Sequence, residues 1–203
     1  MALRRDDRQD PAPGAFLIWI LAAAGTGSTV PGPTYDFCRM FDDFLKANAE
    51  YAEGFALQGI APVAARCFAL VTCMDSRIEP LTMLGLHPGD AKILRNGGAR
   101  VTSDVLRSLI LATHFLGVTQ IAVMQHTNCA LADQTDGDVR ARLDDRGTHG
   151  VEEWEFLAMP DPDGALRSDV ALVRNCPQLP EGVRVEGWRY DVTTGRIQRL
   201  VPS

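Results

Sequence analysis

From Met40 onward, apolar and polar residues are arranged in two different patterns, a helical spacing first and continuous apolar runs afterwards. Over residues 40–55 the apolar side chains recur every three or four positions, which predicts an amphipathic helix that ends near Gly54. Three later stretches are short and almost continuously apolar, as is typical of strands buried on both faces of a parallel sheet. These stretches are Cys67–Thr72, Ala91–Leu94 and Thr119–Gln125.

A second helix is expected between the last two of these strands. Thr102 or Ser103 supplies its N-cap and Gly117 its end. Because strands that alternate with helices join through right-handed crossovers, this order predicts an α/β fold. The fold class we expect is a mostly parallel central sheet with helices on both faces.

The C-terminal third predicts less regular structure. Residues 132–164 are polar and rich in Gly, Asp and Pro, and we expect one short helix there, around Asp138–Asp145. The apolar run Asp169–Val173 predicts a further strand. Residues 183–190 and 197–201 flank a turn sequence and predict a C-terminal β-hairpin.

Composition narrows the class of protein. A length of 203 residues suits one domain, and a net charge of −6 argues against nucleic-acid binding, which needs a basic surface. We also expect no membrane association, because no cluster of Lys and Arg resembles a polybasic anchor. Five cysteines are an odd number without the dense spacing of a disulfide scaffold. We therefore expect reduced thiols and a cytoplasmic location.

The N-terminal 39 residues differ from the rest. We expect the folded domain to span residues 40–203, and residues 1–39 to be a disordered extension or a segment wrongly assigned to the protein, with the true start at Met40. The apolar run at residues 15–24 follows several arginines and leaves a secretory signal peptide as an alternative. It is too short to span a bilayer, which takes about 20 residues.

Potential metal ligands follow two of the predicted strands. The first strand runs into Cys73-Met74-Asp75-Ser76-Arg77, and the third runs into His126-Thr127-Asn128-Cys129. In open α/β sheets, sites form at the carboxyl ends of the strands, so one crossover can bring these segments together. Zinc accepts thiolate and imidazole ligands, and a catalytic zinc keeps three protein ligands and one open position. Cys73, His126 and Cys129 therefore predict a zinc site that activates water.

Asp75 and Arg77 add to this prediction. The Asp75 carboxylate can itself close the fourth zinc position, so it is also a candidate metal ligand. Arg77 can compete for it through a paired, charge-assisted hydrogen bond. Held by Arg77, Asp75 would leave the position open and orient zinc-bound hydroxide. We expect both coordination states, with Arg77 setting the balance.

These motifs, together with the stretch from Gly89 to Gly98 (GDAKILRNGG), resemble the β-class carbonic anhydrases from about Met40 to Val201. The resemblance implies that Cys73, His126 and Cys129 bind Zn²⁺ and that Asp75 and Arg77 form a catalytic pair. It further implies reversible hydration of CO₂ to bicarbonate by a homodimer or homotetramer.

Two positions depart from the family's usual pattern. Ala130 stands where a glycine usually follows the second cysteine, and the chain reads Arg-Asn-Gly-Gly where Arg-Asn-Ala-Gly is usual. If position 130 requires a positive φ or a close approach of the backbone, alanine would cost about 1 kcal/mol or more. Two other functions also fit the residues: hydrolysis of carbonyl sulfide or carbon disulfide at the same site, and a non-catalytic zinc- or bicarbonate-binding protein.

Overall fold

The computed structural model describes residues 40–203, so the predictions for residues 1–39 lie outside the described part. The chain divides into two compact units between Phe55 and Ala56. In the first unit, helix α2 spans Met40–Glu53, as the apolar period predicts. None of its residues is buried, and its apolar residues are exposed.

The second unit is built on one five-stranded sheet with the strand order β2-β1-β3-β4-β5. The strands are β1 (Phe68–Cys73), β2 (Ala91–Asn96), β3 (Gln120–His126), β4 (Arg184–Tyr190) and β5 (Ile197–Val201). The first four are parallel, and β5 returns antiparallel to β4 as the predicted hairpin. β1 and β3 are therefore neighbours at the centre of the sheet, and their carboxyl ends lie side by side.

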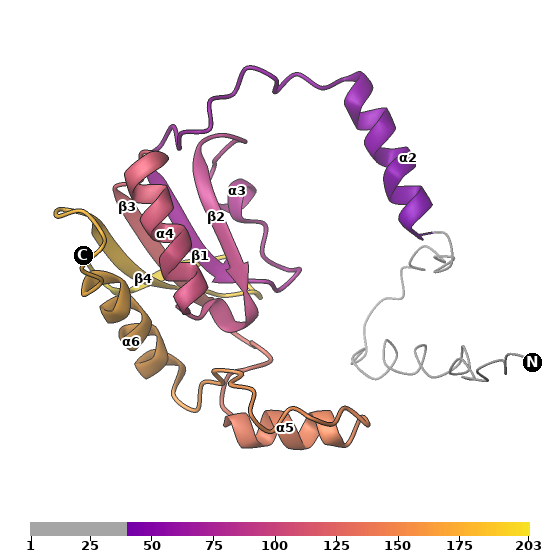
Figure 1. The fold of residues 1–203 in the computed structure, drawn as a ribbon, viewed down its shortest axis with the longest axis vertical. Helices are drawn as coiled ribbons and strands as arrows, with labels where there is room; N and C mark the ends of the chain where they lie inside the picture. Colours follow the sequence, from indigo (N-terminus) through magenta and orange to yellow (C-terminus); the bar gives the residue numbers. More distant parts are fainter. Residues whose placement is uncertain (1–39) are drawn as a thin grey trace, which may run out of the picture. The chain divides into compact units, whose positions relative to one another are not determined.

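Helices α4 (Ser103–Phe115) and α6 (Pro162–Arg174) pack on one face of the sheet (Figure 1). The short helix α3 (Pro80–Met83) contributes Met83 to the core on the other face. The predicted fold class, a mostly parallel sheet with helices and a C-terminal hairpin, is confirmed. Among the residues that the structure describes, no helix has the length and apolar character needed to cross a membrane.

The alternation of side chains along the central strands creates two apolar cores. On the face covered by α4 and α6, the core includes Val71, Val123, Leu109 and Leu166, all fully buried. On the opposite face it is formed around Leu70, Ala122 and Met124 and extends to Cys73. The carboxyl ends of β1 and β3 are thereby anchored in apolar packing.

One predicted strand is wrong. Asp169–Val173 lies within helix α6, which begins at Pro162 after an N-cap at Asp161. The run is apolar because it belongs to a helical stripe, in which Leu166, Val170 and Val173 are buried at spacings of four and three. A short apolar run does not by itself distinguish a buried strand from a buried helix segment.

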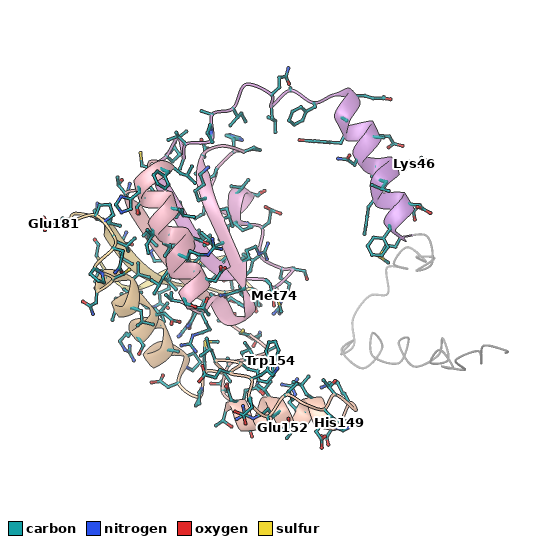
Figure 2. The ribbon with its side chains drawn as sticks, viewed as in Figure 1. Lys46, Met74, His149, Glu152, Trp154 and Glu181 are labelled. Carbon is teal, nitrogen blue, oxygen red and sulfur yellow. The ribbon has the colours of Figure 1, made fainter. Side chains whose placement is uncertain are left out.

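Helix α5 (Asp136–Asp144) forms where a short helix was expected in the polar segment. A capping box between Thr135 and Asp138 begins it. The surrounding side chains, including His149, Glu152 and Trp154, extend into solvent (Figure 2), and Trp154 is 63% exposed. This segment lacks an apolar face of its own. The backbone N–H groups of Phe156 and Ala158 donate to the carboxylate of Asp136 and fix the path of the chain after the helix.

Candidate metal centre

The three predicted ligands converge at the carboxyl end of the sheet. Cys73 is the last residue of β1 and His126 the last of β3, while Cys129 follows in the turn after β3. Their ligand atoms, two Sγ and an imidazole nitrogen, all lie within 4.8 Å of one another. The parallel pairing of β1 with β3 brings these residues together although 53 positions separate Cys73 from His126.

The orientation of His126 suits a metal ligand. Its Nδ1 lies 2.8 Å from the carbonyl oxygen of Thr127, which fixes the proton on Nδ1. The other ring nitrogen, Nε2, is buried and has no hydrogen-bond partner among the described residues. A buried polar atom without a partner is costly, and a metal ion would satisfy it. The donor set of two thiols and one imidazole is the one that Zn²⁺ accepts.

The two thiols influence each other's ionisation. A hydrogen bond from Cys129, together with contacts from His126 and backbone N–H groups, lowers the pKa of Cys73 to about 4 despite its burial. The same hydrogen bond raises the pKa of Cys129. Burial disfavours the charged imidazole, but the Cys73 thiolate raises the pKa of His126. The cluster thus concentrates negative charge that a divalent cation would neutralise.

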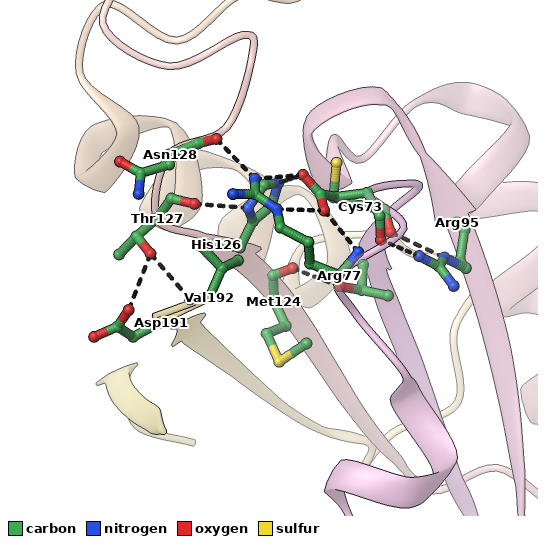
Figure 3. A network of polar contacts seen from close by, with 11 residues as sticks. Cys73, Arg77, Arg95, Met124, His126, Thr127, Asn128, Asp191 and Val192 are labelled. Atoms are coloured by element: carbon green, nitrogen blue, oxygen red, sulfur yellow. Dashed lines mark hydrogen bonds and ion pairs between the residues drawn. The ribbon is translucent and has the colours of Figure 1, made fainter. Parts of the chain in front are cut away.

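Asp75 and Arg77 form a two-pronged ion pair beside the cluster (Figure 3). Arg77 donates from Nε to Asp75 Oδ1 at 2.9 Å and from Nη2 to Oδ2 at 2.7 Å, and its backbone N–H also donates to Oδ1. Arg77 also donates to the carbonyl of Asn128, in the turn that carries Cys129. These hydrogen bonds hold the pKa of Asp75 well below its usual range. Asp75 Oδ2 lies 3.7 Å from His126 Nε2.

Hydrogen bonds of two further residues, Arg95 and Thr127, hold the segments around the site in place, and these contacts were not predicted from the sequence. Arg95 on β2 donates to the carbonyls of Cys73 and Asp75, at 2.9 and 2.6 Å (Figure 3). Thr127 bonds to Asp191 and to the backbone of Val192, which ties the end of β3 to the turn of the hairpin. The position of Arg95 at the end of a strand next to β1 was the only signal in the sequence.

The backbone at Ala130 does not adopt the positive φ that would penalise an alanine. Positive φ occurs at Gly98, with 75°, and at Asn128, with 54°, but not at Gly97 or Ala130. Alanine at position 130 therefore carries no penalty of the left-handed kind. Asparagine is among the residues that adopt a left-handed conformation most readily, which explains the turn at Asn128.

These features define a class: an α/β protein with a two-cysteine, one-histidine metal centre at the carboxyl edge of a parallel sheet. A sequence model of the carbonic anhydrase family matches residues 68–154. β-Carbonic anhydrase 1 of Mycobacterium tuberculosis is 33% identical over 162 residues, covering 79% of this chain and 98% of its own. The chain belongs to the β-carbonic anhydrase family, which is zinc-dependent.

Two more relatives agree with this assignment. The crystal structure of carbonic anhydrase from Streptococcus mutans superposes with a TM-score of 0.73 at 38% identity, covering 79% of this chain and 96% of that one. A carbon disulfide hydrolase of an Acidianus species is 29% identical over 184 residues, covering 79% of this chain and 90% of its own. The chain is therefore similar to proteins named for two different substrates.

Proposed function

We propose that this protein is a carbonic anhydrase that catalyses the reversible hydration of CO₂ to bicarbonate and a proton. The observation that carries the proposal is the convergence of Cys73, His126 and Cys129, with the unpartnered Nε2 of His126 facing two thiols. These three residues would hold the zinc ion. Bound zinc would lower the pKa of a coordinated water to about 7 and so supply a nucleophile at neutral pH.

In this proposal Asp75 orients the attacking water. Arg77 occupies both oxygens of the carboxylate, and Oδ2 keeps a lone pair on the side of His126. Because Arg77 keeps the pKa of Asp75 low, the carboxylate stays ionised and accepts a hydrogen bond without taking the proton. The proton released by the water then passes to solvent or buffer. When Arg77 releases Asp75, the same carboxylate would serve as a fourth metal ligand and close the site.

The test is stopped-flow CO₂ hydration combined with the zinc content per chain. Cys73→Ala should lose zinc and nearly all activity. Cys176→Ala is the matched control, because Cys176 is a free, half-buried thiol outside the cluster. Equal rates for Cys73→Ala and the parent would contradict the proposal. A zinc-loaded parent without hydration activity between about pH 6 and 9 would instead favour a non-catalytic zinc- or bicarbonate-binding protein.

A second candidate, hydrolysis of carbon disulfide or carbonyl sulfide, is favoured by the similarity to carbon disulfide hydrolases. The same constellation would serve, since these molecules also present an electrophilic carbon to the water. Release of sulfide from each substrate should be measured beside CO₂ hydration. A larger kcat/KM for a sulfur substrate would replace the first proposal.

We also propose a homodimer or homotetramer. Helix α2 exposes Phe41, Phe44, Leu45 and Tyr51, and between 56% and 84% of each residue's surface is accessible. Four large apolar side chains exposed on one helix face are typical of an interaction site. One solved relative, a β-carbonic anhydrase from Sordaria macrospora, is described as tetrameric.

A cytoplasmic location is the remaining proposal. Cys67, Cys73, Cys129 and Cys176 are free thiols. Two of them would serve as metal ligands, which requires that they stay reduced. A reducing compartment supplies this condition.

A further inference from the structure

Arg100, which forms a buried ion pair, joins the two loops that contact the candidate zinc ligands Cys73 and Cys129. Arg100 lies just after the 3₁₀ turn η1 (Gly97–Ala99) and pairs with Asp169 of α6, from Nε to Oδ2 at 2.7 Å and from Nη2 to Oδ1 at 3.3 Å. The side chain of Asp169 is 1% exposed and that of Arg100 14%. Neither residue takes part in the chemistry described above.

On one side, Arg100 closes the loop that contacts Cys73. Asn96, which pairs with Cys73 across β1 and β2, donates from Nδ2 to the carbonyl of Arg100 and accepts from its N–H. The loop between them contains Gly98 and Ala99 in left-handed conformations and is buried. In this conformation Ala99 and Cys73 belong to the same buried cluster.

On the other side, Arg100 reaches the loop that contacts Cys129. Its Nη1 donates to the carbonyl of Leu157 at 2.6 Å. Two residues on, Met159 exchanges backbone hydrogen bonds with Leu131 and Asp133. Ala132, the residue after Leu131, donates its backbone N–H to the carbonyl of Cys129 at 3.1 Å. A single guanidinium is therefore shared between the two segments that contact the two candidate ligands.

Direct packing joins the same two loops. A side chain built on Gly98 would meet Leu131 Cδ1 at 3.3 Å and Met159 Cε at 3.4 Å. The two loops are therefore in contact, and the ion pair between Arg100 and Asp169 of α6 fixes the distance between them.

We propose that Arg100 and Asp169 are positioning residues for the metal centre, which hold the segments around Gly98 and Leu131 against Cys73 and Cys129. The inference rests on the proposed zinc site. Contacts around a metal ligand fix its direction, and such outer contacts typically change metal affinity by about 10- to 100-fold. Without the pair, the two thiolates would be held less firmly.

The variants must avoid an unpaired buried charge. Burial raises the pKa of Asp169 even with Arg100 beside it, so removing Arg100 alone would threaten the fold. The double variant Arg100→Met/Asp169→Leu removes both charges and keeps the volume. Asp169→Asn is the milder variant, because it keeps an acceptor for Arg100. Arg107→Met is the matched control, since Arg107 forms an exposed pair with Asp104 on α4.

Two readouts separate positioning from stability: the sulfur-to-metal charge-transfer band of the Co²⁺-substituted protein, and the rate of zinc release to a chelator. In the double variant we expect a shifted band and zinc release at least about 10-fold faster. Asp169→Asn should give a smaller change in the same direction, and Arg107→Met none. Activity is not needed for either measurement.

Three results would overturn the inference. If the folded double variant matches the parent in band position and release rate, the pair only stabilises the fold. If the double variant does not fold, an unchanged band and rate in Asp169→Asn lead to the same conclusion. If the parent itself shows no charge-transfer band with Co²⁺, the metal centre is absent and the proposed function fails with the inference.

Discussion

At the scale of single residues, the candidate metal centre depends on the paired hydrogen bonds of the Arg77 guanidinium and on the backbone around Gly98. Both oxygens of Asp75 bind the planar guanidinium, and a third hydrogen bond from Arg77 reaches the turn before Cys129. A lysine carries the same charge but cannot make the paired contact. Geometry, and not charge alone, therefore sets the direction of the Asp75 carboxylate.

Arg77→Lys should lower kcat/KM for CO₂ by about 100-fold, the usual effect of misplacing an orienting group. Zinc content and the free energy of unfolding should change little, because Arg77 is about half exposed. Stopped-flow hydration and metal analysis check both. Arg107→Lys, in the exposed pair on α4, should leave the rate unchanged. A normal rate in Arg77→Lys would show that catalysis does not need the paired hydrogen bonds between Arg77 and Asp75.

The adjacent glycines should respond in opposite ways to alanine. Gly97 has no positive φ, and an added Cβ meets Leu131 Cδ1 at an ordinary 3.5 Å, so Gly97→Ala should raise stability by about 0.4–1 kcal/mol. Gly98 has a φ of 75° and less space, so Gly98→Ala should lower stability by about 1–2 kcal/mol. Urea unfolding measures both. Equal effects would mean that the loop adapts freely.

At the scale of elements, the sequence identified most of the sheet. The predicted strands at Cys67–Thr72 and Thr119–Gln125 are each displaced by one residue from β1 and β3, so that Cys73 and His126 themselves end the strands. The error at Asp169–Val173 arose because an apolar run within a helix stripe has the composition of a buried strand. Periodicity over the whole of Pro162–Arg174 would have indicated the helix.

The connection after α5 gives a prediction that depends on pH. Burial opposes ionisation of Asp136, but hydrogen bonds from the N–H groups of Ala158 and Phe156 lower its pKa. Its stabilisation is therefore full above the unfolded value of about 3.9 and is lost as pH falls through the lower folded value. Asp136→Asn should cost about 1–3 kcal/mol at neutral pH.

Urea unfolding at a series of pH values tests this prediction. The difference in unfolding free energy between the parent and Asp136→Asn should be largest near neutrality and should narrow below about pH 4. A constant difference across the range would mean that the charge of Asp136 plays no part.

At the scale of the whole molecule, the apolar face of α2 predicts self-association. Phe44→Gln/Leu45→Gln should weaken the oligomer at least about 100-fold, since each buried apolar side chain contributes about 1.5–3 kcal/mol. Size-exclusion chromatography with light scattering at several concentrations measures this. Lys46→Gln/Glu50→Gln changes the opposite face of the helix and should have no effect. An unchanged mass in the apolar variant would place the interface elsewhere.

The sequence by itself determined the candidate ligands and most of the strands, because buried strands leave a distinct pattern and zinc accepts few donor types. Cys73, His126 and Cys129 could be named before any coordinates, since each follows or ends a strand. The tertiary structure alone decided which groups support them. Arg95, Asp191, Arg100 and Asp169 come from segments distant in sequence, and only the pairing of strands and the packing of α6 bring them to the site. Such contacts leave no local pattern, because charged residues at strand ends and on helices usually face solvent.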